Sequence, residues 1–384
     1  MCRQSAPPPP PVWRALPSEL HEMRKAGSDD DVDVFDAMMG IEAEEFAALL
    51  DDDDDDDDDD GGSSAALCRG GVPVVRIDEL TAEAFRERFM ERRVPVVVQD
   101  PKGEVVPMHL TPAYLRDTYG TKRVPLDVTG PDRRDVLLRD FIEQLVRAEP
   151  LEEEEGGVDD AEAGLVCEAQ RRASGDRAEG SEDLRGRYMR NLQMAEWFPE
   201  EAETLRLPAI FGDNMLHDLE KVPSCPANWR KWFELFVCHP TCKGFPFLHR
   251  DTCHVYAASM QISGRKRFTM FHPDDGPFLY PVGATGSRSN VPAEIFTVTG
   301  ITPDVLRSYP ALAHAKRITC DVAPGEILLV PPDWWHTARA MGPDPSVSIA
   351  ASFVDQAGLD QFVDAYAEFS AMQSLVKVGA GVIS

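Results

Sequence analysis

Short stretches of apolar residues, separated by turns, dominate the chain from residue 72 to residue 354. Residues 72–77 and 94–98 are rich in valine and predict strands. Residues 82–90 between them have the apolar spacing of a helix. The pattern therefore predicts a strand–helix–strand start to the folded region.

Two more helices are expected before the chain's most β-rich part. Residues 111–120 carry a possible N-cap in Thr111, a proline in the first turn and a glycine at the end. The second helix includes Phe141, Ile142, Leu145 and Val146. We expect these elements to form an α+β buttress for a larger β structure rather than an independent domain.

The later part of the chain reads as strands followed by one helix. Residues 245–262 combine aromatic and β-branched residues before a turn at Gly264, and residues 327–330 form an apolar run closed by two prolines. The final segment predicts a helix with one apolar face, made by Leu359, Phe362, Val363, Tyr366 and Phe369. This face either packs on its own domain or forms a homodimer.

Negative charge is concentrated outside these elements. The net charge is −28. Residues 1–62 contribute −16 and residues 149–183 contribute −10, which leaves −2 for the rest. Ten consecutive aspartates at 51–60 cannot pack against one another, so we expect residues 1–65 to be a disordered, acidic and proline-rich tail. Residues 149–184 predict a flexible acidic insertion.

His249, Asp251 and His336 carry the strongest chemical signal. On an extended segment, alternate residues point to the same side, so His249 and Asp251 face together while Arg250 points away. His336 follows the apolar run at its far end. Two imidazoles and one carboxylate can hold one face of an Fe(II) ion and leave the other face open. The spacing therefore predicts a metal site of an oxygenase.

The segments around these residues resemble the cupin-like JmjC family of Fe(II)- and 2-oxoglutarate-dependent oxygenases, including the asparaginyl hydroxylases. The likeness runs through His249-x-Asp251, through residues 262–268 and 271–273, through 279–281, and through 325–336. It implies a mainly β double-stranded β-helix, or jelly roll, with flanking helices and the N-terminal α+β buttress. The implied catalytic domain covers residues 66–354, with its jelly-roll core at about 225–354 and a C-terminal helix in 355–384.

The resemblance also assigns the cofactors and two binding residues. His249, Asp251 and His336 would be the catalytic metal ligands, with 2-oxoglutarate as cosubstrate and O₂ as oxidant. Lys266 would pair with the distal carboxylate of 2-oxoglutarate, and the Tyr188 hydroxyl would support the same carboxylate. A fixed positive charge in a water-poor pocket suits a dicarboxylate. Without the resemblance, Tyr188 reads equally well as a half-buried aromatic with a solvated hydroxyl.

Three departures separate the chain from that family's pattern. Pro246 stands where many members carry a threonine that bonds the cosubstrate. About two extra residues lie between Asp251 and Lys266, which predicts a bulge or a shifted strand. Ser352 stands where an asparagine often lies close to the metal, and its side chain reaches less far. Trp334 and Trp335 fit either the cavity wall or ordinary jelly-roll packing.

A second metal site must be weighed. Cys238, His239, Cys242, Cys253 and His254 lie close together in sequence, and thiolates with imidazoles favour zinc. However, no second paired set of ligands follows, and the adjacent Cys253 and His254 would face opposite sides of a strand. Buried or half-exposed thiols are therefore the favoured interpretation.

Hydroxylation of a protein side chain is the reaction that we expect. The alternatives are lysine demethylation, hydroxylation of a small molecule or tRNA base, and a noncatalytic jelly-roll binding protein. Acidic segments repel phosphate, so direct nucleic-acid binding is not expected. No apolar run approaches membrane-spanning length, and eight irregularly spaced cysteines suit a reducing compartment. These features predict no membrane contact and a location in the cytoplasm or nucleus.

Overall fold

The structure is a computed structural model that describes residues 67–69, 71–127, 133–146, 183–216, 232–283 and 285–369. The chain divides into Met1–Asp59 and Asp60–Ser384, and all described residues belong to the second unit. The predicted acidic tail and nearly all of the predicted insertion lie outside the described residues. Leu184, near the end of that insertion, is buried and belongs to the core.

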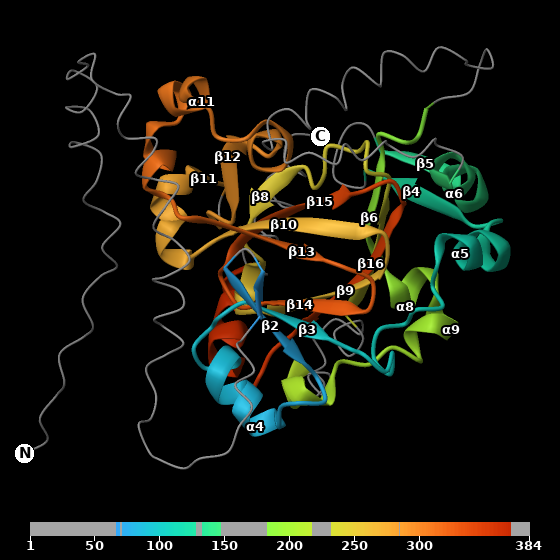
Figure 1. The fold of residues 1–384 in the computed structure, drawn as a ribbon, viewed down its shortest axis with the longest axis horizontal. Helices are drawn as coiled ribbons and strands as arrows, with labels where there is room; N and C mark the ends of the chain where they lie inside the picture. Colours follow the sequence, from blue (N-terminus) through green and yellow to red (C-terminus); the bar gives the residue numbers. More distant parts are fainter. Residues whose placement is uncertain are drawn as a thin grey trace, which may run out of the picture. The chain divides into compact units, whose positions relative to one another are not determined.

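Two sheets form the centre of the described unit (Figure 1). Among the described strands every pairing is antiparallel except that of β2 with β3. The larger sheet has the order β1 (Leu67–Arg69), β2 (Val72–Arg76), β3 (Val96–Gln99), β14 (Glu326–Val330), β9 (Tyr256–Ser263), β16 (Ser346–Phe353), β7 (Phe233–Cys238) and β6 (Tyr188–Gln193). The smaller sheet has the order β11 (Pro281–Val282), β12 (Arg288–Pro292), β8 (Phe247–His249), β15 (Trp335–Met341), β10 (Arg265–Phe271) and β13 (Arg317–Val322).

The two sheets pack face to face, as the jelly-roll prediction requires. Leu328 and Val330 of β14 share one buried cluster with Phe268 and Met270 of β10. The alternate residues Ile327 and Leu329 belong to a second cluster on the outer side of the larger sheet. Strand β14 is therefore buried on both faces, which explains why its sequence is a continuous apolar run rather than an alternating one.

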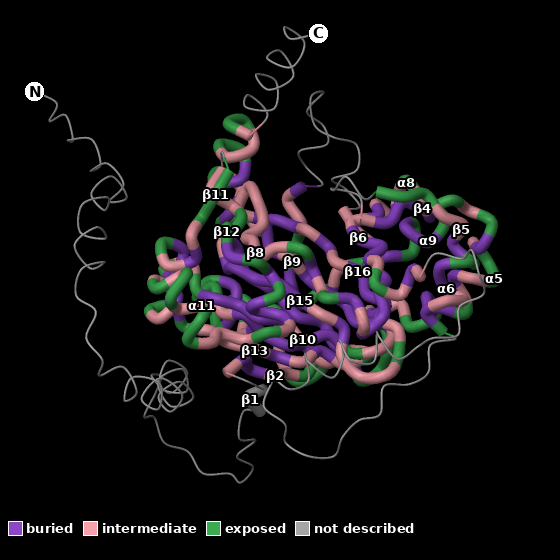
Figure 2. The backbone as a smooth tube through the Cα atoms, turned by 90° about the horizontal axis from the view of Figure 1, so that it is seen from above, coloured by how far each residue is buried: buried purple, intermediate pink, exposed green. Residues whose placement is uncertain are grey.

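Helices that precede β7 in the chain cover the outer face of the larger sheet. Their buried side chains join the outward-facing strand residues in one large apolar cluster. Figure 2 colours the backbone of buried residues purple. These elements are α4 (Ala82–Phe85), η3 (Arg86–Met90), α5 (Pro112–Tyr119), α6 (Leu138–Val146), α8 (Met194–Trp197), α9 (Pro199–Ala202) and η4 (Ala209–Phe211), with the hairpin of β4 (Arg123–Leu126) and β5 (Arg134–Leu137).

The N-terminal module is more than a buttress. Strands β2, β3 and β6 are members of the larger sheet itself, so the β core extends well beyond the expected start at about residue 225. The local pattern predicted β2 and β3 correctly but did not predict β6. It also does not encode that β3 pairs with β14, more than two hundred positions later. On the outer side of the smaller sheet lie η7 (Pro273–Leu279), η8 (Ile295–Thr299), α11 (Pro303–Ser308) and η9 (Pro310–His314).

The start of α5 confirms its predicted capping, but its end differs from the prediction. The Thr111 side chain accepts a hydrogen bond from the Tyr114 backbone N–H, and a proline occupies the first turn. Gly120 does not adopt the left-handed conformation of a common glycine cap, since its φ is −58°. A Cβ atom there would lie 2.2 Å from the Arg116 carbonyl oxygen, so lack of space explains the glycine.

The strand expected over residues 245–262 is broken. Strand β8 ends at His249, and η6 (Thr252–His254) separates it from β9. Cys253 and His254 both have positive φ angles, 65° and 53°. A left-handed turn thus absorbs part of the extra length before Lys266, and a register shift opposite Val347 and Ser348 in β16 disrupts the β9 ladder as well.

The C-terminal helix covers at least residues 359–369. Its Phe362 is buried in a cluster with Leu216, Val255 and Val354 of the same unit, while Val363 stays 43% exposed. The predicted apolar face is therefore used within the domain, at least in part. Dimerisation through this helix stays a prediction. Within the described ranges, no helix combines the length and apolar character needed to cross a membrane.

Candidate metal centre

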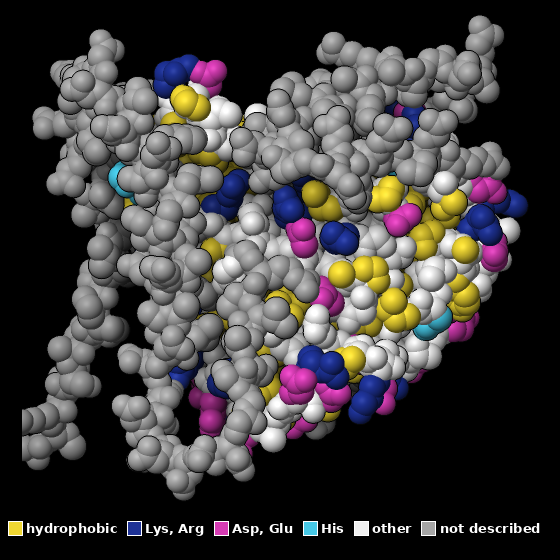
Figure 3. All heavy atoms as spheres, viewed as in Figure 1, with side chains coloured by type: hydrophobic (Ala, Val, Ile, Leu, Met, Phe, Trp, Pro, Cys, Tyr) yellow, Lys and Arg dark blue, Asp and Glu magenta, His cyan; other side chains and the backbone are white. Residues whose placement is uncertain are grey.

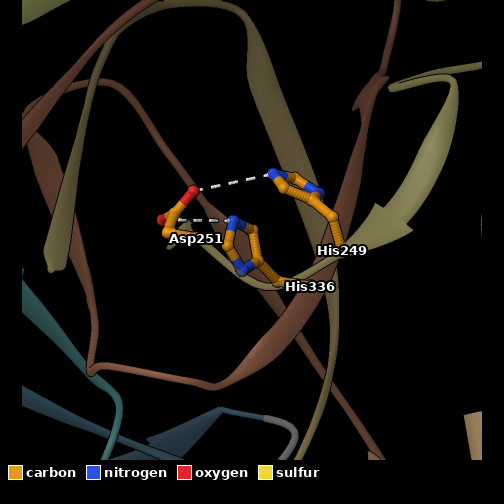
Figure 4. A group of neighbouring side chains, drawn as sticks. All are labelled: His249, Asp251 and His336. Atoms are coloured by element: carbon orange, nitrogen blue, oxygen red, sulfur yellow. Dashed lines mark ion pairs between the residues drawn. The ribbon is translucent and has the colours of Figure 1, made fainter. Parts of the chain in front are cut away.

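His249, Asp251 and His336 meet at one point between the sheets (Figure 4). His249 is the last residue of β8, and it lies directly opposite His336 of β15 in the sheet register. Asp251 follows β8 in extended conformation, with φ −64° and ψ 142°, immediately before η6. Asp251 is therefore outside the strand that was expected to carry it, but its backbone keeps the extended geometry that turns it toward His249.

The donor atoms of the three side chains fit a shared cation. One donor atom from each residue lies within 4.8 Å of the others. The Nε2 atoms of His249 and His336 are 3.8 Å and 3.9 Å from the two Asp251 carboxylate oxygens, as the dashed lines in Figure 4 show. These separations are too long for hydrogen bonds. Two imidazole nitrogens and one carboxylate form the donor set that holds Fe(II) and leaves coordination positions open.

The surroundings of the two imidazoles favour metal binding. The Nδ1 atom of His336 lies 3.0 Å from the Trp334 carbonyl oxygen, so Nδ1–H donates there and Nε2 keeps its lone pair for a metal. Burial and the neighbouring His336 lower the pKa of His249 well below its ordinary value. The Nδ1 atom of His249 is buried and has no hydrogen-bond partner among the described protein atoms.

A polar network ties the two metal-binding segments together. Arg250, between the first two candidate ligands, donates to the Asp333 carboxylate at 3.0 Å, and His254 bonds the other oxygen of Asp333 at 2.6 Å. Asp333 precedes His336 by three residues and has a positive φ of 68°. Burial alone would raise the pKa of Asp333, but His254, Arg250 and Arg93 outweigh it and lower that pKa. This network was not anticipated from sequence.

Lys266 and Tyr188 lie side by side inside the same half of the sandwich. Lys266 is 3% exposed, donates to the Ser348 hydroxyl at 2.6 Å, and has its Nζ atom 5.7 Å from the centre of the Tyr188 ring. Burial lowers the pKa of Lys266 to about 8. Tyr188 is also buried, so it is not the half-buried aromatic with a solvated hydroxyl that the sequence also allowed. The roles of both residues toward a cosubstrate stay predictions.

Aromatic rings connect this pair to the candidate metal ligands. Phe245 stacks on His249 with ring centroids 4.7 Å apart, and it meets Tyr188 edge to face at 6.3 Å. Arg190 lies over Phe245 at 5.3 Å and is itself buried. The space between the sheets therefore combines the three donors, a buried lysine and an apolar wall. The arrangement can hold an anion next to a metal and keep water away from both.

The structure also locates the two adjacent tryptophans, Ser352 and Pro246. Trp334 points into the cluster between the sheets and donates to the Arg93 carbonyl, whereas Trp335 joins the cluster on the outer side of the smaller sheet. Both tryptophans serve packing. Ser352 alternates with the outward-facing Ala351 and Phe353, so it faces the inner side. It lines a cavity at the end of β16 together with Trp232 and Ala351. Pro246 immediately precedes β8.

The zinc alternative gains no support from the described residues. His249, Asp251 and His336 form the one group of three or more potential ligands that these residues bring together. His239 is buried and its Nδ1 atom bonds Thr241 at 2.9 Å. Cys253 and His254 lie on the left-handed turn rather than on the expected strand, and His254 binds Asp333.

Sequence reasoning missed one polar cluster next to the site. Glu234 of β7 accepts hydrogen bonds from Asn191 at 2.9 Å and from Gln193 at 2.7 Å. Burial raises the pKa of Glu234, and the charge of Asp251 raises it further, although the hydrogen bonds oppose them. The available signal was a single acid within the otherwise apolar run of residues 233–238.

Fold and site together define a jelly-roll protein with a two-histidine, one-carboxylate centre. A family model described as a cupin-like domain matches residues 81–354, and the chain belongs to this JmjC-type cupin family. The match takes in the N-terminal helices, the smaller sheet and all of the larger sheet except β1 and β2.

Two groups of relatives share sequence with the chain. It is 25% identical to the chicken tRNA wybutosine-synthesizing protein 5 over 69% of this chain and 72% of that protein. It is 34% identical to the mouse HSPB1-associated protein 1 over 29% of this chain and 21% of that protein. The zebrafish homologue of the latter is 38% identical over 24% of this chain. The alignments thus span only about a fifth of the HSPB1-associated proteins.

Proposed function

We propose that this protein is an Fe(II)- and 2-oxoglutarate-dependent dioxygenase that hydroxylates a protein side chain. The observation that carries the proposal is the convergence of His249, Asp251 and His336 from separate segments onto one point inside the jelly roll. The cupin-like family and the relatives involved in wybutosine synthesis support an enzyme of the oxygenase type.

Different residues of the chain would bind the metal, bind the cosubstrate and exclude water. His249, Asp251 and His336 would hold the metal, which together with 2-oxoglutarate and O₂ supplies the oxidising chemistry for a C–H bond when bound. Lys266 would bind the far carboxylate of 2-oxoglutarate, where burial strengthens an ion pair. The Tyr188 hydroxyl would support the same carboxylate. Phe236 and Phe245 border this space and would exclude water from it.

Bound carboxylate would also keep Lys266 charged. Burial lowers the pKa of Lys266 to about 8, so in the free protein it costs free energy to keep the ammonium group charged between aromatic rings. An anion next to the ammonium group favours the charged form and raises that pKa again. The buried lysine therefore supports a site that is built for an acidic ligand.

A tRNA base is the second candidate substrate. The similarity to tRNA wybutosine-synthesizing protein 5 over about two thirds of the chain favours it. Against it, Lys and Arg side chains alternate with Asp and Glu on the described part of the face in Figure 3, whereas phosphate backbones are bound by clustered basic residues.

Succinate formation tests the proposal. Purified protein with Fe(II), 2-oxoglutarate and O₂ should form succinate, and Asp251→Ala should not, because it removes the carboxylate ligand. A matched control is Asp274→Asn, which changes a side chain that is 92% exposed. Equal succinate formation by wild type and Asp251→Ala would reject the site, and absence of formation in both would favour a noncatalytic binding protein.

A further inference from the structure

The polar cluster of Glu234, Asn191 and Gln193 lies where strand β6 departs from regular pairing. Gln193 is opposite Glu234 and Met189 is opposite Val237, so β6 carries one extra residue between these two pairs. Asn191 lies in this bulge with a positive φ of 55°. The bulge lets both the Asn191 and the Gln193 side chains reach the Glu234 carboxylate.

The cluster faces the inside of the jelly roll. Phe236 and Cys238, two and four positions after Glu234, belong to the inner apolar cluster that also contains Tyr188. The alternate residues Phe233, Leu235 and Val237 belong to the outer one. Alternation along β7 therefore turns Glu234 toward the space that holds Asp251, whose charge acts on it.

Acceptors exceed donors in this cluster. The described part of the chain gives Glu234 two amide donors, and the Trp232 indole N–H also acts on it, but none of these three groups is cationic. A carboxylate can accept about four hydrogen bonds. Gln193 uses its NH₂ group on Glu234, and its Oε1 atom is buried with no hydrogen-bond partner among the described atoms. Such a buried acceptor destabilises the folded protein unless a donor reaches it.

A cavity begins at the residues that precede Glu234, and it provides room for a larger molecule. It has a volume of about 590 Å³ and is lined partly by Trp232 and Phe233, which directly precede Glu234, and by Ser352 at the end of β16. Glu234 and Gln193 themselves lie outside its lining. Glu203 and Asp213 add two acids to its wall, against the single base Arg206. This cavity offers more negative than positive charge, which favours a cationic occupant and opposes phosphate.

We propose that Glu234 and Gln193 form the subsite that receives a cationic, N–H-bearing side chain of a protein substrate, with the guanidinium group of arginine as the best fit. This inference rests on the proposed function. Glu234 and Gln193 are cross-strand neighbours, so a carboxylate oxygen and an amide oxygen lie close enough for a planar fork of donors.

Paramagnetic relaxation by Mn(II) in place of Fe(II) tests the subsite. The full chain is loaded with Mn(II) and an unreactive oxoglutarate analogue, and two short blocked peptides are added that differ only in carrying arginine or its neutral isostere citrulline. In wild type, the side-chain protons of arginine should relax at least about tenfold more than those of citrulline, because only the charged group pairs with Glu234. Weak binding is sufficient for this readout.

Two variants locate the effect. Glu234→Gln keeps the shape of the side chain, and it should reduce the relaxation of arginine to the level of citrulline. Gln193→Met removes the second acceptor and should cause a partial loss. Glu294→Gln, which alters an exposed pair with Lys243, should leave the relaxation unchanged. Thermal unfolding of each variant verifies that it is folded.

The outcomes separate this inference from the proposed function. Mn(II) uptake, followed by electron paramagnetic resonance, must occur in wild type and fail in Asp251→Ala. If uptake is normal but arginine and citrulline relax equally, or Glu234→Gln changes nothing, the subsite is overturned and the oxygenase proposal stands. If wild type takes up no Mn(II), both are overturned.

Discussion

His254 and Asp333 are joined by a hydrogen bond of 2.6 Å between Nδ1 and Oδ2, and this bond connects the turn after Asp251 with the turn before His336. Arg250 binds the other oxygen of the same carboxylate. Asp333 is only 15% exposed at its side chain, so the network is partly shielded from solvent. Residues that fix the segments carrying metal ligands tune the affinity for the metal.

Asp333→Asn should therefore weaken metal binding without unfolding the protein. Asparagine tolerates the positive φ of this position, so the change removes mainly the charge that holds Arg250 and His254. We expect the Kd for Mn(II) to rise about tenfold. Electron paramagnetic resonance titration measures this, with Asp274→Asn as the control on an exposed acid. An unchanged Kd would show that the network does not position the ligands.

Lys266→Met should stabilise the protein and abolish 2-oxoglutarate binding. Below about pH 8 the folded protein holds a buried ammonium ion, at a cost that an apolar side chain of similar length avoids. We expect a gain on the order of 2 kcal/mol at pH 7 in urea unfolding, together with loss of the calorimetric signal for an oxoglutarate analogue.

The stability gained by Lys266→Met should change with pH in a defined direction. The pKa of Lys266 is lowered from 10.5 to about 8 on folding, so between these values the unfolded chain binds a proton that the folded chain does not. The wild type therefore gains stability as the pH rises from about 8 to 10.5. The advantage of Lys266→Met must shrink over the same range. A constant difference would contradict the burial of a charged lysine.

Glu201 provides a test of the N-terminal buttress. Its buried carboxylate accepts from Tyr114 at 2.6 Å and Tyr119 at 2.9 Å, and it meets His109 at 2.9 Å. Burial alone raises the pKa of Glu201, but these three bonds outweigh it and lower that pKa. Glu201→Gln should cost about 1–3 kcal/mol at neutral pH, since an amide cannot accept all three donors.

Acid should remove this difference. A carboxyl group with a lowered pKa contributes stability that is full above its ordinary value of 4.5 and is lost as the pH falls through the folded value. Urea unfolding of wild type and Glu201→Gln should therefore converge below pH 4.5. If the free energies of unfolding of the two proteins differ equally at neutral pH and below pH 4.5, the carboxylate is not the stabilising group.

Gly120→Ala should destabilise the end of α5 by steric overlap alone. The new methyl group would lie 2.2 Å from the Arg116 carbonyl oxygen and 2.9 Å from the Arg139 Cβ atom, and overpacking of this kind costs about 1–3 kcal/mol. Gly186→Ala is the matched control, because no heavy atom lies within 4 Å of the added carbon. Equal thermal unfolding of the two variants would contradict this explanation.

The local pattern predicted what depends on neighbours in sequence. The Thr111 cap, the strands of residues 72–76 and 96–99, and the proximity of His249 and Asp251 all follow from short-range periodicity or turn chemistry. The position of His336 after the apolar run, together with the resemblance to a known family, brought His336 into the same site. Each of these features is set within a few residues, or by a motif that is contiguous in the chain.

Features that depend on distant pairing could not be predicted. The opposition of Gln193 and Glu234 arises from the β6–β7 register, and that register is set by packing of both strands against the outer core. Cys253 and His254 adopt left-handed conformations, but neither is a glycine or an asparagine, so the sequence does not predict this turn. His254 adopts this conformation where its imidazole also reaches Asp333, seventy-nine positions later.

Anaerobic Fe(II) titration tests the central claim most directly. Wild-type protein should bind one Fe(II) per chain, and His249→Ala, Asp251→Ala and His336→Ala should each abolish this binding, because two ligands cannot hold the ion at the same point. His272→Ala, which alters an imidazole that is 54% exposed, should bind as the wild type does. Failure of the wild type to take up iron, or uptake that persists in all three variants, would contradict the account.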